Sequence, residues 1–273
     1  MTATSFLKAF RKFLHSLTSC PLPEEQLEIG RQAYWDLVEH VRENPFYAVA
    51  YAAAEGVRAP YEVQLRAVEL AAEVGPERLA EEPGLAERVF EKAGALFGNI
   101  RGEVLRRGAK CYLEICGEDE RECVEDPEKR LALADCMFPP KRWPKGDYHG
   151  GKKSRDLLLL ALGDENAVPV DRHVDYWACQ VAGLYCPRKY ERGRTLPPKE
   201  YRAIQEAIRE AAEACNVTPA ELMVSVWVYG VCNREVGAKP AFPMVDDIYV
   251  YCRKGQTTLE EHYERPEEWV PEE

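Results

Sequence analysis

Two ionisable residues, Lys153 and Asp171, lie eighteen positions apart in a segment whose residue types suit covalent chemistry at a carbon centre. Lys153 follows the turn Gly150-Gly151 at the expected start of a helix. There the helix dipole and the neighbouring Lys152 both disfavour an ammonium ion, so we expect a lowered pKa. A lysine that is partly neutral can act as a nucleophile.

The chain between these two residues can bring them together. An apolar run over 157–162 predicts a helix that ends at Gly163-Asp164, and Val168-Pro-Val170 then returns the chain to Asp171. We therefore expect the Lys153 amine and the Asp171 carboxylate to converge. Each signal also has an ordinary interpretation: a solvated turn for the two lysines, and a helix N-cap for Asp171.

This segment resembles the helix-hairpin-helix DNA glycosylases, which combine a glycine-rich hairpin, a lysine at the head of a helix and an aspartate in a Val-Asp-x-His run. The matching residues are Gly151, Lys153, Ser154 and Asp156, followed by Val170-Asp-Arg-His173. The resemblance covers about the second half of the chain, where 181–184 and 199–236 are similar to the archaeal 8-oxoguanine glycosylases. The hairpin departs from the usual pattern at His149, where the family has a glycine.

The resemblance implies a bifunctional DNA glycosylase with AP lyase activity, an enzyme of base excision repair. In such enzymes the aspartate, here Asp171, helps to break the N-glycosidic bond, and the lysine attacks C1′ to form a Schiff base that permits β-elimination. Lys153 is the expected nucleophile, with Lys152 as the alternative. The damaged base must be flipped out of the duplex. The resemblance places Trp227 against that base, although a core tryptophan is the other interpretation; 8-oxoguanine is the expected lesion, with oxidised pyrimidines and hypoxanthine as alternatives.

The expected partner is damaged double-stranded DNA. A net charge of −11 opposes binding to phosphates, but basic residues gather at 141–155 and 188–202, and either cluster could instead be a solvated face. We expect DNA contacts from Lys145, His149, Gly150, Gly151, Lys152, Arg155 and Arg172. A non-catalytic helix-hairpin-helix DNA-binding or scaffold protein is the alternative. A hydrolase that uses Cys and His is disfavoured, because the five histidines are scattered.

Apolar residues recur every three or four positions along most of the chain, so the predicted fold is all-α. Only 247–252 alternates in the manner of a strand. By resemblance, a six-helix barrel at 45–163 ends in the hairpin, a second helical lobe comprises 1–44 and 164–273, and the active-site cleft lies between them. The expected helices are 4–18, 24–43, 45–55, 60–73, 76–81, 84–97, 100–115, 127–137, 152–162, 171–183, 198–214 and 218–236.

The 273 residues, 46% of them apolar, can fill a globular core, and no apolar run is long enough to span a membrane. Residues 1–14 alternate apolar and basic types, unlike a secretion signal, so we expect a cytoplasmic protein. We also expect it to be a monomer.

Ten cysteines leave several possibilities open. Cys179 and Cys186 begin an iron–sulfur spacing that the chain does not complete, so we expect no cluster and no other cofactor. Zinc at Cys111, Cys116, Cys123 and Cys136 lacks the paired spacing that makes such a site convincing. Disulfides would fit a hyperthermophilic, archaeal source. Buried thiols are the default for Cys215 and Cys232.

Overall fold

A computed structural model describes residues 20–55, 61–95, 98–117, 121–139, 151–171, 174 and 198–234. Every regular element in these ranges is a helix, which confirms the all-α class. The helices are α2 (Glu24–Glu43), α3 (Phe46–Ala54), α4 (Tyr61–Val74), α5 (Pro76–Glu81), α6 (Leu85–Ala93), α7 (Gly98–Ile115), α8 (Glu122–Glu125), α9 (Pro127–Met137), α10 (Lys152–Ala161), α12 (Pro198–Cys215) and α13 (Pro219–Arg234).

Predicted and observed helix bounds agree at α2, α5 and α9 and differ by a few residues at the other predicted helices that the structure describes. The short helix α8 was not predicted. The helix expected at 4–18 and the alternating segment 247–252 lie outside the described residues, as does nearly all of the helix expected at 171–183.

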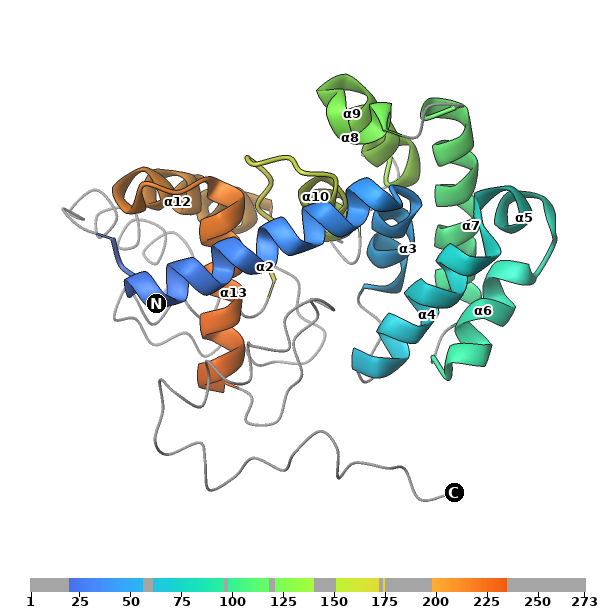
Figure 1. Ribbon diagram of the computed structural model, residues 1–273, viewed down its shortest axis with the longest axis horizontal. Coiled ribbons are helices and arrows are strands. Elements are labelled where there is room, and N and C mark those ends of the chain that lie inside the picture. Colours follow the sequence, from blue (N-terminus) through green and yellow to red (C-terminus); the bar gives the residue numbers. More distant parts are fainter. Residues whose placement is uncertain are drawn as a thin grey trace, which may run out of the picture.

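Helix α3 lies in the middle of the helices that follow it in sequence (Figure 1). All nine of its residues are buried, as expected for a helix that is apolar on every side. It packs against α4, α7 and α10, while α7 also contacts α5, α6 and α9. A wholly buried helix cannot move without opening the core, so its C-terminal end is a fixed point in the molecule.

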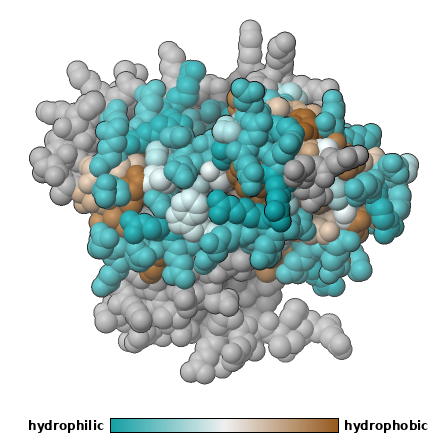
Figure 2. Space-filling model, turned by 45° about the horizontal axis from the view of Figure 1, so that its top comes forward, coloured by the Kyte–Doolittle hydropathy of each residue, from teal (hydrophilic) through white to brown (hydrophobic). Residues whose placement is uncertain are grey.

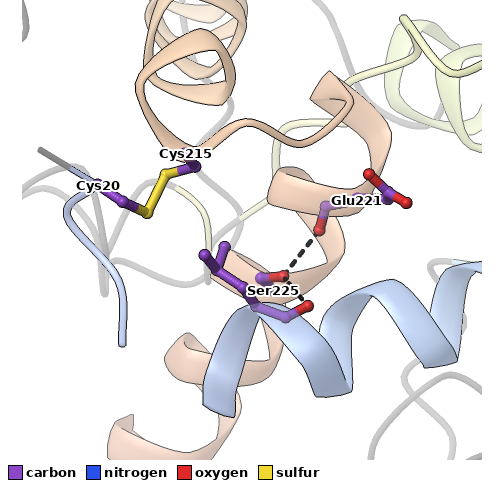
Figure 3. Close-up of a disulfide and its surroundings, with 5 residues drawn as sticks. Cys20, Cys215, Glu221 and Ser225 are labelled. Atoms are coloured by element: carbon purple, nitrogen blue, oxygen red, sulfur yellow. Dashed lines mark hydrogen bonds between the residues drawn. A yellow bond between two sulfur atoms is a disulfide. The ribbon is translucent and has the colours of Figure 1, made fainter. Parts of the chain in front are cut away.

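The long helix α2 crosses α13 and packs against it (Figure 1). The two helices approach closely at Gly30, where an added Cβ would lie 2.5 Å from the Cα atom of Ser225. Polar contacts fix the register: the Gln26 side-chain amide donates to the Ser225 carbonyl at 3.0 Å, and the Trp35 indole N–H donates to Glu221 Oε1 at 2.9 Å. Figure 3 shows Ser225 between Glu221 and the backbone of α2.

Helix α13 begins with residues typical of a helix N-terminus. Thr218 Oγ1 accepts from the Glu221 backbone N–H at 3.2 Å, and Glu221 Oε2 accepts from the Thr218 N–H at 2.8 Å. This reciprocal pair is a capping box, and Pro219 takes the first helical position, where no N–H is needed.

Three disulfides join described residues. Cys20–Cys215 links the segment before α2 to the end of α12 (Figure 3), Cys111–Cys136 links α7 to α9, and Cys116–Cys123 links the end of α7 to α8. The four cysteines considered for zinc are therefore two disulfides, and the expectation of a buried thiol at Cys215 was wrong. The side chains of the other four cysteines are not among those that the structure describes.

On the face drawn in Figure 2, hydrophilic residues cover most of the described surface. Among described residues, the large apolar side chains that are exposed are Ile100 and Leu131. None of the described helices is both long enough and apolar enough to cross a membrane. The division into a barrel and a second lobe stays a prediction.

Candidate active site

Helix α10 positions both lysines of the predicted hairpin segment. Its last five residues, Leu157–Ala161, are all buried, and the helix packs against α3 and α9. Its N-cap is Gly151, and Lys152 and Lys153 form its first turn. The buried C-terminal half thus holds the first turn at a fixed place, with the Lys153 amine at the end of α3. The connection 140–150 between α9 and α10 lies outside the described residues, so the hairpin itself stays a prediction.

Lys153 and Asp171 converge as the sequence predicted. The Lys153 Nζ atom lies 3.7 Å from Asp171 Oδ2, and their side chains are 27% and 10% exposed. The return of the chain is fixed by Val168 and Val170, which are both buried. An amine and a carboxylate therefore meet in a partly solvated place rather than in the core.

Hydrogen bonds orient the Asp171 carboxylate. Oδ1 accepts from the Val174 backbone N–H at 3.0 Å, and Oδ2 accepts from the Trp227 indole N–H at 3.2 Å. The first contact joins residues three apart, as at a helix N-cap, but the helix expected at 171–183 lies almost entirely outside the described residues, so the N-cap interpretation stays a prediction. The second contact brings α13 to the site, because Trp227 belongs to that helix and its indole N–H points at Asp171. Trp227 itself is 8% exposed.

Glu55 is a site residue that sequence reasoning missed. It is the C-cap residue of α3, and one of its carboxylate oxygens contacts the Lys153 amine directly. Its side chain is 15% exposed. A charged residue directly after an entirely apolar helix was a weak signal that the carboxylate has a partner. The partner is 98 residues away in sequence, so its identity could not be inferred.

A half-buried arginine, Arg101, lies near Glu55. Arg101 on α7 donates through Nη1 to the Ala53 carbonyl at 3.3 Å. Burial lowers the pKa of its guanidinium, and the negative charge of Glu55 opposes that effect. Arg101 thus supplies positive charge beside the end of α3.

Lys152 occupies a different environment from Lys153. Its Nζ atom donates to Gln205 Oε1 at 3.2 Å, lies 3.4 Å from Asp156 Oδ2, and sits 4.7 Å from the centre of the Tyr201 ring. Burial lowers the pKa of Lys152, and Asp156 opposes that effect. Burial raises the pKa of Asp156, and Lys152 opposes it.

The cluster around Asp156 fixes the segment that leads to Asp171. The Gln205 side-chain amide donates to Asp156 Oδ2 at 2.8 Å and to the Val168 carbonyl at 2.9 Å. Tyr201 donates its hydroxyl to Asp156 Oδ2 at 2.9 Å and accepts from the Val170 N–H at 3.1 Å. Burial raises the pKa of this hydroxyl well above its usual value. Helix α12 therefore holds 168–170 against α10.

The residues predicted to contact DNA are described only in part. The Arg155 guanidinium makes ion pairs with Asp135 at 2.7 Å and Asp156 at 3.4 Å. Lys152 is engaged in the cluster just described, and Gly151 is the N-cap of α10. The DNA contacts of all three stay predictions. The other four, Lys145, His149, Gly150 and Arg172, lie outside the described residues.

Comparisons of the chain with protein-family models, with curated protein sequences and with solved structures gave no match. The described residues contain no group of three or more His, Cys, Asp or Glu side chains placed to hold a metal ion.

Proposed function

We propose that the protein is a DNA glycosylase with AP lyase activity that excises an oxidised base. The observation that carries the proposal is the 3.7 Å separation between Lys153 Nζ and Asp171 Oδ2, produced by a helix and a return segment that join residues eighteen positions apart. A partly exposed amine beside an oriented carboxylate suits covalent attack at a sugar carbon.

The two groups have separate tasks in the proposed reaction. Loss of the base leaves a positively charged, oxocarbenium-like sugar, which the fixed carboxylate of Asp171 can stabilise. The Lys153 amine forms a bond to C1′, and opening of the sugar ring gives a Schiff base. The Schiff base acidifies C2′, so that a proton is lost there and the 3′ phosphate leaves. Covalent catalysis thereby divides a difficult step into easier ones.

The surroundings of the pair suit a flipped nucleotide. In the proposed complex, the N-terminus of α10, which carries Lys153 in its first turn, offers its positive dipole end to a phosphate of the DNA. Trp227 donates to Asp171, so its indole lies beside the place where a base would leave C1′. We propose 8-oxoguanine as the base and damaged duplex DNA as the partner.

Reduction with borohydride tests this proposal, because it traps a Schiff base as a stable covalent adduct. Duplexes that each carry one lesion are incubated with the wild-type protein, Lys153→Gln, Lys152→Gln and Lys110→Gln. The last replaces an exposed lysine on α7 and serves as the control. We expect adducts with every variant except Lys153→Gln, and the strongest signal on 8-oxoguanine.

Asp171→Asn separates base release from binding. It should slow base release by about 100-fold or more, since an amide cannot stabilise the sugar cation as a carboxylate does, while affinity for DNA changes little. A protein that binds these duplexes but forms no adduct in any form would instead be a non-catalytic DNA-binding module.

A further inference from the structure

We propose that Glu55 is the general base that takes the proton from the Lys153 ammonium before that amine attacks the sugar. The inference rests on the proposed function and assigns a third catalytic residue to the same site. A general base must lie within hydrogen-bond reach of the proton that it removes, and the Glu55 carboxylate contacts Lys153 Nζ directly.

The fold presents Glu55 at a fixed position. The residue follows the last turn of α3, whose nine residues are all buried, and its N–H donates to the Tyr51 carbonyl at 3.1 Å. Lys153 comes from α10, which packs against α3. Neither backbone can shift without disturbing the core, so the carboxylate and the amine are held in register.

Asp171 is less suited to this proton transfer. Its Oδ2 atom is 3.7 Å from Lys153 Nζ, beyond a good hydrogen bond, and it accepts from the Trp227 indole. Its other oxygen accepts from the Val174 N–H. These donors fix the Asp171 carboxylate in place as an anion beside the sugar, whereas Glu55 makes its direct contact with the nucleophile. The two acids therefore take different parts in the reaction.

The charges that face Glu55 allow this exchange. Lys153 faces it from α10, Asp171 lies on the far side of that amine, and Arg101 approaches from α7. When Lys153 gives up its proton to Glu55, one negative charge is lost together with the positive one. Arg101 keeps positive charge beside the end of α3.

In the proposed step, one proton moves from the Lys153 ammonium to the Glu55 carboxylate, which leaves a neutral amine and a carboxylic acid. The nitrogen lone pair forms the bond to C1′, and the bond from C1′ to the base breaks. The base leaves with that electron pair and takes up the proton that Glu55 held, directly or through solvent. Glu55 is then again a carboxylate, and the new C1′–N nitrogen carries the positive charge.

A duplex with a preformed abasic site tests the inference, because no base has to leave and the step observed is attack by the amine. The rate of borohydride-trappable adduct formation is measured from pH 6 to 9 for the wild type, Glu55→Gln and Glu82→Gln. Glu82 pairs with Arg78 on an exposed surface and is the matched control. We expect Glu55→Gln to be about 100-fold slower near neutral pH, with the deficit shrinking as hydroxide replaces the missing base.

A merely structural ion pair predicts the opposite result. Removing an anion beside an ammonium favours the neutral amine, so Glu55→Gln would then react as fast as the wild type, or faster, near neutral pH. That outcome would overturn the role of Glu55 as a general base, while the proposed lyase activity would still stand. A wild-type protein that forms no adduct would overturn the proposed function and the inference together.

Glu55→Asp keeps the test valid if the glutamine variant does not fold. It retains a carboxylate but places it farther from the amine, so its rate should lie between those of the wild type and Glu55→Gln, with the pH profile of the wild type. If Glu55→Gln does not fold, a rate of Glu55→Asp equal to that of the wild type at every pH would contradict the proposal.

Discussion

Lys152 and Lys153 are adjacent in sequence, yet they face different parts of the protein. Successive residues of a helix point about 100° apart. Lys152 is therefore turned toward α12, where Gln205 accepts from its amine, and it pairs with Asp156 one turn along α10. Lys153 is turned toward Glu55 and Asp171. The geometry thus favours Lys153 as the nucleophile over the alternative that the sequence left open.

The ion pair between Lys152 and Asp156 should make stability depend on pH when it is broken. Burial raises the pKa of Asp156, and Lys152 opposes that rise. In Lys152→Met the opposing charge is gone, so the pKa of Asp156 in the folded protein rises further. Folded Asp156 then keeps a proton that it releases in the unfolded chain. The stabilisation from this proton is present below the pKa of about 4 that Asp156 has when unfolded, and it is lost as pH increases through the pKa of folded Asp156.

Urea unfolding of Lys152→Met at several values between pH 4 and pH 8 measures this effect. The unfolding free energy should fall with increasing pH more steeply than in the wild type, by about 1.4 kcal/mol for each unit by which the folded pKa exceeds the wild-type value. The double variant Lys152→Met/Asp156→Asn should lose the added slope. Parallel profiles for Lys152→Met and the wild type would contradict this account of the cluster.

The convergence of Lys153 and Asp171 could be predicted because both residues lie in one segment whose turns and apolar helix are visible in sequence. The contact of Glu55 could not be predicted. It depends on how α3 packs against α10, and packing between distant helices leaves no local pattern in the chain.

At the scale of the elements, helix periodicity and end signals were informative. Thr218, Pro219 and Glu221 mark the start of α13, and Asp126 and Pro127 mark the start of α9. The helix α8 was missed, since four residues are too few to show a period. The disulfide pairing was also beyond sequence reasoning, because it depends on which helix ends meet.

The crossing of α2 and α13 gives a prediction for an element contact. In Gly30→Ala the new methyl group would lie 1.9 Å from Ser225 Oγ and 2.5 Å from Ser225 Cα, so the helices must separate. We expect a loss of about 3 kcal/mol in the free energy of unfolding. Gly98→Ala in α7 is the control, since its nearest neighbours would be 3.4 Å away.

Chemical denaturation of both glycine variants measures this loss of stability. The control should unfold within about 0.5 kcal/mol of the wild type, as expected for a substitution that causes no clash. Equal stability of Gly30→Ala and Gly98→Ala would show that α2 and α13 do not approach so closely in solution.

Across the whole molecule, the disulfides differ in how much of the chain they constrain. Cys20 and Cys215 are 195 residues apart, so their bond ties the segment before α2 to the C-terminal end of α12, whereas Cys116 and Cys123 are only seven apart. A crosslink that closes a longer loop removes more entropy from the unfolded chain. The first bond should therefore contribute more to stability.

Paired serine substitutions test this ranking. In the chain-entropy treatment, replacing both Cys20 and Cys215 should cost about 5 kcal/mol, and replacing both Cys116 and Cys123 about half as much. Guanidinium unfolding under non-reducing conditions provides both values. Equal costs for the two pairs would show that loop length does not govern the stabilisation.

The net charge of −11 belongs to the whole molecule, but the proposed reaction depends on a local arrangement. At the site, Lys153 stands between two carboxylates, and its amine is the group that must become bonded to DNA. The identity of the residue that becomes bonded to DNA is therefore the most direct evidence for or against the proposed function.

That residue can be found by reducing the complex with damaged duplex, digesting it, and locating the modified peptide by mass spectrometry. We expect a sugar-derived adduct on Lys153, with Lys152 unmodified. An adduct on Lys152 or on the terminal amine, or no adduct at all on any lesion offered, would contradict the proposed role of Lys153.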